Sequence, residues 1–336
     1  MSTSRKGPVL LIGGSGVVGS QAAKALRRLH PDLPIAIGGR DLGKAEAVAA
    51  EIGRAAAVAI DLERADLGLP AKESYSAVSM FVKDETLRPL RYAQAHGIPY
   101  VDISTGAFDI GPEVALYIRA PDRAPILLGS GWLAGAATLP AIHFAREFRT
   151  VDSIAIGAIL DEEDMGGPAA YADYERYTTL VPNALVRAGG KWLWIGGADA
   201  VRRFKDSEGT DVEGRAYGAL DAISLGAALD AHSVRFDFAM GKSAGRRRGE
   251  PLSTETIIEI EGVQKDGRRA RARHELIHPA GQAPVTGLGT ALAIERLLGL
   301  AGGAAPAPGL YLPEVLIEPG YAVERFAEFG TRIRKV

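Results

Sequence analysis

Three glycines near the start of the chain have the spacing of a dinucleotide-binding turn. Gly14, Gly16 and Gly19 form a G-x-G-x-x-G set directly after the apolar stretch 9–12 and directly before a helical pattern. In such a turn Gly14 permits the tight bend, Gly16 lets the backbone approach a pyrophosphate, and Gly19 lets the helix pack closely on the sheet. The first N–H groups of the helix then face the diphosphate with a partial positive charge. We therefore expect a pyridine dinucleotide on Gly14, Ser15, Gly16, Val17, Val18 and Gly19.

The residue after the second apolar strand distinguishes NAD from NADP. Arg40 ends the segment Gly38-Gly39-Arg40, where an NAD-binding protein usually has an acid for the ribose 2′-hydroxyl. A guanidinium pairs with a 2′-phosphate, which an acid would repel. The sequence therefore favours NADP as the cofactor. One alternative stays open, in which Arg40 is a solvated loop residue and the neighbouring Asp41 faces the ribose.

Further cofactor contacts are expected where other strands end. Asp61 and Leu62 follow the third strand and are expected beside the adenine, although an ordinary loop explains them almost as well. Ligands of open α/β sheets bind beyond the carboxyl ends of the strands. The loops that begin at Ser79, at Asp102 and at Gly129 are therefore expected to border the nicotinamide, and Ser79 is an expected cofactor contact.

Candidate catalytic residues come from the same loops. Lys83 follows the fourth strand and could orient a carboxylate or donate a proton, or it is a surface lysine. Asp102 and Ser104 close the fifth strand, and the alternative for Asp102 is a loop hydrogen bond. Trp132 either walls a pocket or packs in the core.

Three other features beyond residue 160 also have alternative interpretations. Tyr171, Tyr174 and Tyr177 recur at helical spacing, which fits either a substrate-facing surface or ordinary packing. The acidic run 161–164 either attracts an amine or forms a solvated turn. The run 246–248 of three arginines is expected in an exposed hairpin loop, with an anion clamp as the second interpretation.

The elements that position these residues predict an α/β fold. Up to about Leu128, short apolar strands alternate with helical patterns, which is typical of a Rossmann-type, doubly wound parallel sheet. After about Thr150 the pattern changes to alternating strands, as in SVRFDFAM, where Val234 and Phe236 share one face. This predicts a second α+β domain with a mixed or antiparallel sheet, a helical insert at 168–188, and amphipathic helices near the C-terminus.

The predicted domain bounds follow from this change of pattern. Residues 1–130 are expected to form the dinucleotide-binding domain, completed by C-terminal helices over about 286–336. Residues 131–285 are expected to form a domain for substrate binding and dimerisation. A chain of 336 residues suits two domains better than one.

Composition excludes several other functions. The 39 basic and 41 acidic residues give a net charge of −2, so we expect a small-molecule substrate and neither nucleic acid nor membrane as a partner. The chain has no cysteine, which excludes disulfides and thiol nucleophiles. The start, MSTSRKGPVLLIGG, lacks the apolar stretch of a signal peptide, and the uncharged segment 124–145 is interrupted by proline and glycine, so we expect a cytoplasmic protein. The sequence has no H-E-x-x-H motif and no clustered set of metal ligands, so we expect no bound metal.

Three segments resemble a known family. They are GGSGVVGSQAAKAL, IAIGGRDLGKAEAVAAEIG and AHGIPYVDIS, and in them the chain resembles the saccharopine dehydrogenase-like NAD(P)-binding reductases. The closing stretch PGLYLPEVLIEPGYAVERFAEFG is similar to that family as well, whereas the middle of the chain is not. The resemblance implies a Rossmann domain completed by C-terminal helices, a mixed-sheet second domain, a homodimer, and reduction or oxidation at a carbon–nitrogen bond.

We therefore expect an NADP-dependent oxidoreductase that moves a hydride to or from a small polar substrate at a C=N bond. A protonated imine needs no strong acid, which suits a chain without an obvious catalytic residue. Two alternatives remain: a non-catalytic NADP-binding sensor or partner protein, and a reductase of C=C or C=O bonds.

Overall fold

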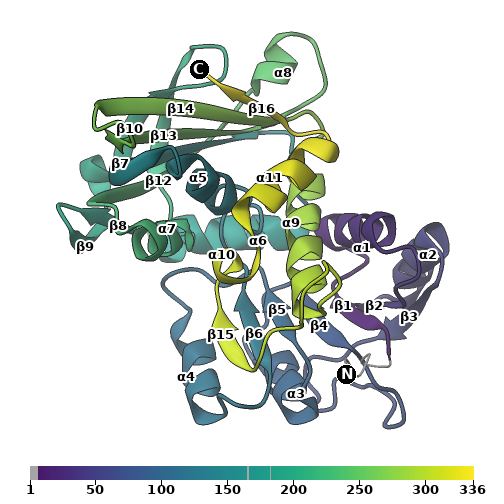
Figure 1. Cartoon of the computed structure of the whole chain (residues 1–336). Helices are drawn as coiled ribbons and strands as arrows, with labels where there is room; N and C mark the ends of the chain where they lie inside the picture. Colours follow the sequence, from purple (N-terminus) through teal and green to yellow (C-terminus); the bar gives the residue numbers. More distant parts are fainter. Residues whose placement is uncertain (1–6, 165, 182) are drawn as a thin grey trace. The chain divides into compact units, whose positions relative to one another are not determined.

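The computed structural model describes residues 7–164, 166–181 and 183–336. The chain divides into two compact units, which are described separately (Figure 1). The first contains the chain up to Thr105, Asp109–Ser130 and Thr286–Ile317, and the second contains Gly106–Phe108, Gly131–Val285 and Glu318–Val336. Positions 1–6, the first part of the segment MSTSRKGPVLLIGG, lie outside the described residues.

The first unit alternates strands with helices. Its elements are β1 (Val9–Ile12), α1 (Val17–Leu29), β2 (Ile35–Gly39), α2 (Leu42–Ile52), β3 (Ala55–Ala59), β4 (Ala77–Met80), α3 (Arg88–His96), β5 (Tyr100–Asp102), α4 (Gly111–Arg119), β6 (Pro125–Leu128), β15 (Gly309–Tyr311) and α10 (Pro313–Leu316). Helix α9 (Gln282–Leu297) begins in the second unit and continues into the first.

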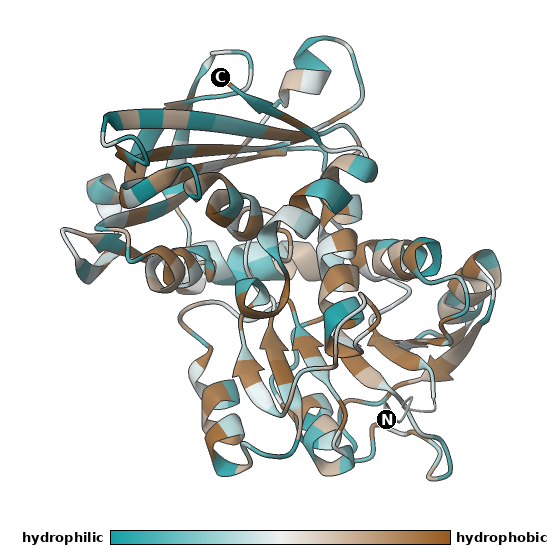
Figure 2. Ribbon diagram, in the orientation of Figure 1, coloured by the Kyte–Doolittle hydropathy of each residue, from teal (hydrophilic) through white to brown (hydrophobic). Residues whose placement is uncertain are grey.

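The described strands of the first unit form a parallel sheet in the order β15-β6-β5-β4-β1-β2-β3. The six strands β1–β6 follow the doubly wound order of dinucleotide-binding sheets. Strands β1, β4, β5 and β6 are buried throughout, as expected for a sheet covered on both faces, and Figure 2 shows the hydrophobic colour along much of this sheet.

The register aligns the carboxyl ends of these strands. One row of paired residues crosses the sheet and consists of Leu128, Asp102, Met80, Ile12 and Gly38. Because the strands are parallel, the loops that follow them leave from the same edge. The sheet thus brings together the segments that contain the predicted site residues.

The second unit contains a larger sheet and its helices. Its elements are α5 (Thr138–Ala145), β7 (Phe148–Asp161), α6 (Pro168–Glu175), a π-helical turn (Arg176–Leu180), β8 (Ala184–Ala188), β9 (Lys191–Ile195), a 3₁₀ turn (Gly197–Ala200), β10 (Val201–Lys205), β11 (Asp211–Ala216), α7 (Asp221–Leu229), β12 (Ser233–Gly241), α8 (Ala244–Arg247), β13 (Thr254–Gln264), β14 (Arg269–His278), α11 (Pro319–Glu328) and β16 (Arg332–Lys335). The helical insert expected at 168–188 is wrong in its second half, because 184–188 pairs with β9 as a strand.

The sheet of the second unit is mixed. Its described strands follow the order β10-β11-β12-β7-β13-β14-β16, and β8 pairs with β12 and β9. Strand β12 pairs with β7 in parallel, whereas the other pairs are antiparallel. The mixed alternative of the predicted fold class is therefore confirmed. Val234, Phe236 and Phe238 are buried on one face of β12, but Met240 near the end of the strand is exposed.

The end of the chain differs from the expected division. Residues 318–336, expected to complete the first domain, belong to the second unit. The reason is that β16 pairs with β14, with Arg334 opposite Glu275 and Ile333 opposite Leu276. None of the helices in the described parts of the chain is long and apolar enough to cross a membrane.

Candidate functional site

The turn between β1 and α1 is built so that only glycine fits at several positions. The positive φ of this turn, +82°, is at Gly13. The tight bend therefore does not need a positive φ at Gly14. A Cβ on Gly14 would lie 2.7 Å from the Leu11 carbonyl oxygen, and one on Gly19 would lie 2.4 Å from the Gly13 carbonyl oxygen. The close packing expected of Gly19 is thus present, and Gly14 is required by lack of space.

Gly16 differs from the glycines on either side of it. It is exposed, it has an ordinary φ of −77°, and it precedes α1 as an N-cap without a side-chain hydrogen bond. The first N–H groups of a helix have no acceptor within the helix. The N–H groups of Val17 and Val18 therefore remain available for an anion, and the macrodipole favours a negative charge there.

Arg40 directly follows β2, the strand that pairs with β1 in the first unit. A Cβ on Gly39 would lie 3.3 Å from Ser15 Oγ, so the end of β2 and the glycine turn are neighbours. Arg40 is exposed and makes no hydrogen bond or ion pair with any residue that the structure describes. Asp41, the alternative ribose contact, caps α2 by accepting a hydrogen bond of 3.1 Å from Lys44 N–H. This placement favours Arg40 over Asp41 as the group available to the ribose.

The other predicted cofactor contacts lie in different surroundings. Asp61 is exposed and accepts a hydrogen bond of 2.9 Å from Glu63 N–H, which fixes the loop after β3. The Leu62 carbonyl accepts one of 2.6 Å from Arg88. Ser79 lies inside β4 and is fully buried, and its hydroxyl has no partner among the described residues. Ser79 is therefore placed within the sheet, not in the loop beyond its edge.

The predicted catalytic residues gather at the ends of β4 and β5. Lys83 Nζ lies 2.9 Å from Asp109 Oδ2, and both side chains are mostly buried, so Lys83 is not a freely solvated surface lysine. Asp102 is buried and accepts a hydrogen bond of 3.0 Å from Ser104 N–H, which is the loop interaction considered for it. Ser104 is buried as well.

Asp102 also belongs to a buried pair of carboxyl groups. Its partner is Glu113, in the first turn of α4, and Thr105 joins the two. Thr105 Oγ1 lies 2.5 Å from Asp102 Oδ2 and 2.8 Å from Glu113 Oε1. Burial raises the pKa of Asp102, and burial together with the charge of Asp102 raises the pKa of Glu113 to about 8. The two carboxyls therefore titrate as one system.

The sequence pattern does not single out Thr105 or Glu113. An acid in the first turn of a helix is common because it complements the macrodipole, so Glu113 resembles an ordinary surface residue. The one available signal is that acids stand at both ends of the connection from β5 to α4. Only the folded connection shows that they share one hydroxyl group.

The aromatic candidates lie in the second unit. Tyr177 stacks on Tyr217, with ring centroids 4.9 Å apart, and Tyr174 lies 5.9 Å from Phe238. Tyr171 is exposed. The three tyrosines of the repeat therefore differ in exposure and in their ring contacts, and they do not form one shared surface.

Trp132 is buried against the same group of aromatic side chains. Its ring lies 5.4 Å from that of Phe238, 5.6 Å from that of Phe236 and 6.3 Å from that of Tyr217. These contacts favour the core-packing alternative for Trp132.

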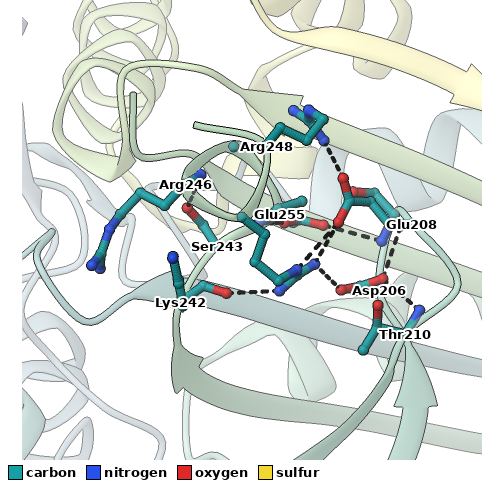
Figure 3. A network of polar contacts seen from close by, with 12 residues as sticks. Asp206, Glu208, Thr210, Lys242, Ser243, Arg246, Arg248 and Glu255 are labelled. Carbon is teal, nitrogen blue, oxygen red and sulfur yellow. Dashed lines mark hydrogen bonds and ion pairs between the residues drawn. The ribbon is translucent and has the colours of Figure 1, made fainter. Parts of the chain in front are cut away.

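The three consecutive arginines are neutralised by the chain itself. In place of the expected hairpin loop, the structure has the short helix α8 and its C-terminal end. The guanidinium groups of 246–248 pair with carboxylates. Arg248 and Glu208, for example, lie 2.6 Å apart, and Figure 3 shows this pair. Arg246 lies 2.7 Å from Asp161, which is fully buried, whereas Glu162 and Glu163 are exposed turn residues, so the solvated-turn interpretation holds for these two residues and not for Asp161. Both the anion clamp and the amine site lose their support, because these opposite charges bind each other.

No family model matches the sequence. No curated protein is similar to it at a significant level.

Solved structures match the fold at low sequence identity. The apo saccharopine dehydrogenase (L-Glu forming) from Saccharomyces cerevisiae gives a TM-score of 0.68 at 14% identity, over 98% of this chain and 100% of that chain. The WlbA dehydrogenase from Chromobacterium violaceum, in complex with NADH and UDP-GlcNAcA, gives 0.49 at 12% identity, over 100% and 97%. A myo-inositol dehydrogenase from Corynebacterium glutamicum gives 0.47 at 13%, over 97% and 98%. The first match confirms the resemblance to saccharopine dehydrogenase at the level of the fold.

Proposed function

We propose that the chain is an NADP-dependent oxidoreductase that transfers a hydride to or from a small polar molecule at a carbon–nitrogen bond. One observation carries the proposal: an exposed, uncapped helix N-terminus at Gly16 adjoins the segment that ends in the unpaired Arg40. The diphosphate and the 2′-phosphate of one NADP molecule are the anions that such a combination of donors fits.

The chain's own residues would divide the binding of the cofactor between them. The N–H groups of Val17 and Val18 would hold the diphosphate, and Arg40 would pair with the 2′-phosphate. Asp41 is engaged as a helix cap, which leaves the ribose to the guanidinium. When bound, the nicotinamide supplies the hydride acceptor or donor.

Lys83 and Asp109 are the groups that we assign to the substrate. Both follow strands whose carboxyl ends border the expected nicotinamide position, and their ion pair holds the lysine in place. The Lys83 ammonium group has three hydrogens, so beside its bond to Asp109 it would have a donor left to orient a substrate carboxylate. An iminium carbon accepts a hydride without a strong acid because the nitrogen already carries a proton, which favours C=N over C=O or C=C as the reacting bond.

Calorimetric titration of the full chain with NADPH and NADH tests the cofactor, and we expect NADPH to bind at least about tenfold more tightly, the effect of one charge-assisted contact. NADPH oxidation is then followed with three substrate classes: 2-oxo acids plus amines, ketones, and enones. Turnover confined to the first class is expected. Tight NADPH binding without turnover in any class would favour a non-catalytic sensor, and binding of neither nucleotide would remove the proposal.

A further inference from the structure

The contact of Thr105 with two carboxyl groups limits how many charges the cluster can hold. A threonine hydroxyl has one hydrogen and can donate it to one acceptor. Thr105 Oγ1 is nevertheless within hydrogen-bond distance of Asp102 Oδ2 and of Glu113 Oε1. If both carboxyls were ionised, one of these contacts would bring two oxygens together without a hydrogen. One of the acids must therefore carry a proton and donate it to Thr105.

Burial makes the doubly charged state costly as well. Thr105 is fully buried, and Asp102 and Glu113 are only 4% and 2% exposed. Bulk water has little access to such positions, and an unpaired buried charge is expensive. The pair is therefore stable with one negative charge and unstable with two.

The surroundings decide which acid is ionised. Asp102 Oδ1 accepts a hydrogen bond from Ser104 N–H, and Oδ2 accepts the one from Thr105, so both of its oxygens have donors. Glu113 Oε2 is buried and has no partner among the described residues. A carboxylate needs donors at both oxygens more than a neutral acid does. The proton therefore belongs on Glu113.

The other charged groups that face the pair fit this assignment. Lys83, which follows β4, interacts favourably with both acids, and Asp109, which precedes α4, pairs with Lys83. Tyr100 of β5 interacts with both acids and with Asp84. The ammonium group of Lys83 thus already interacts with Asp109 and with Asp102. If Glu113 were ionised as well, none of these described groups would give it a cation of its own.

We infer that Glu113 is a positioning residue that carries a proton at neutral pH, donates it to Thr105, and leaves Asp102 as the single carboxylate of the pair near Lys83. Thr105 N–H in turn donates a hydrogen bond of 2.8 Å to Ser130 Oγ. Through Thr105, the neutral Glu113 thereby holds the loop after β5 in place. It also limits the negative charge of the pair near Lys83 to one carboxylate. Its effect on the reaction rests on the proposed function, whereas its protonation does not.

The direct test is a pH titration of the full chain, without nucleotide, in which the glutamate side-chain carboxyl carbons are labelled with ¹³C. We expect one resonance to remain protonated up to a midpoint of about 8, far above the ordinary glutamate value of 4.5. This resonance should be absent from Glu113→Gln and present in Glu46→Gln, which changes an exposed glutamate of α2. If Glu113→Gln does not fold, Glu113→Asp removes the same resonance and retains a carboxyl group.

Two results would overturn the inference: every glutamate resonance titrating in the ordinary range, or the high midpoint appearing in aspartate-labelled protein instead. An activity profile adds a second readout, since wild-type kcat/KM should fall on the alkaline side as Glu113 loses its proton, and Glu113→Gln should lack that limb. The two proposals fail separately. A high glutamate midpoint in a protein that binds no nucleotide removes only the oxidoreductase, and turnover with ordinary midpoints removes only the role of Glu113.

Discussion

The carboxylate of Asp221 accepts a hydrogen bond of 2.6 Å from the backbone N–H of Trp132, 89 positions earlier in the chain. It accepts a second one of 2.6 Å from Thr138 Oγ1 and is fully buried. Between these two donors, Leu133 and Ala134 adopt φ values of +49° and +56°. Residues other than glycine rarely adopt positive φ values. The two hydrogen bonds to Asp221 therefore compensate for backbone strain in the loop before α5.

Replacing Asp221 by alanine should therefore be strongly destabilising. It leaves two buried donors unsatisfied, and we expect the free energy of unfolding to fall by about 2–4 kcal/mol. Urea denaturation measures this loss. The control is Asp211→Ala, which removes an exposed ion pair with Lys205 and should cost less than about 1 kcal/mol. Equal losses in the two variants would refute the role of Asp221.

Alanine substitutions in the glycine turn should separate folding from binding. At Gly19 a Cβ would lie 2.4 Å from the Gly13 carbonyl oxygen and 2.7 Å from Gly14 Cα, so Gly19→Ala should lower the thermal midpoint of unfolding by several degrees. At Gly16 the Gly13 carbonyl oxygen, at 3.2 Å, is the one atom of the described residues within 4 Å of an added Cβ, and Gly16 is exposed. Gly16→Ala should therefore keep the thermal midpoint but weaken NADPH binding at least about tenfold, because the added methyl group blocks the diphosphate. Unchanged NADPH affinity in Gly16→Ala would place the diphosphate elsewhere.

Arg40→Ala should change the choice of cofactor. One charge-assisted interaction contributes about 1.5–3 kcal/mol, so NADPH affinity should fall by about 10- to 100-fold while NADH affinity stays the same. Calorimetry with both nucleotides measures this difference. Arg91→Ala, at an exposed arginine of α3 in the same unit, is the matched control for charge. If both variants lose NADPH affinity equally, the effect comes from net charge and not from a 2′-phosphate contact.

The Asp161–Arg246 pair should make the stability of the fold decrease in acid. Burial alone would raise the pKa of Asp161, but hydrogen bonds from Ser243, Glu163 N–H and Arg246 lower it to about 2. A lowered folded pKa gives stability above the unfolded value of 3.8 that is lost as the pH falls through about 2, a contribution of about 2 kcal/mol. Wild-type unfolding free energy should fall between pH 4 and pH 2, and Asp161→Asn should show a smaller fall. Glu162→Gln, an exposed neighbour, should behave like the wild type.

Because the pKa of Glu113 is raised, Glu113 should make the stability of the fold decrease as the pH rises, which is the opposite of the effect of Asp161. The pKa of Glu113 is raised by burial and by Asp102 to about 8, so between its ordinary value of 4.5 and about 8 the folded chain holds a proton that the unfolded chain has released. Stability should therefore decrease as the pH rises through this window, by up to about 1.4 kcal/mol per pH unit. Urea denaturation at several pH values measures the slope, and Glu113→Gln should reduce it. The same slope in Glu113→Gln and wild type would contradict this prediction.

The first unit could be predicted from its sequence because local signals determine it. Buried parallel strands are short apolar runs, crossover helices have a 3.6-residue period, and the glycine turn has a fixed place between the two. The residue types around Arg40 and Asp41 left two interpretations open, and the hydrogen bond from Lys44 N–H to Asp41 favours Arg40 as the ribose contact, which stays a prediction. A helix cap of this kind is visible in the sequence only as a preference.

The strand order and strand directions of the second unit, and the acid pair, could not be predicted, because they depend on contacts between distant segments. The parallel pairing of β12 with β7 joins residues about 80 positions apart, and alternation of side chains does not reveal strand direction. Arg246 and Asp161 each resembled a solvated charge until the fold placed them 2.7 Å apart. Ser79 stands where many α/β proteins contact a ligand, yet β4 continues past it and encloses it.

Strand β15 has a consequence for synthesis of the protein on the ribosome. Its pairing of Gly309 with Pro125 and of Tyr311 with Leu127 joins segments separated by more than half of the chain. Until the last part of the polypeptide emerges, β6 keeps an open, fully apolar edge that other chains can pair with. A nascent chain that pauses before this point is therefore at risk of aggregation, and truncation before Gly309 should leave that risk permanent.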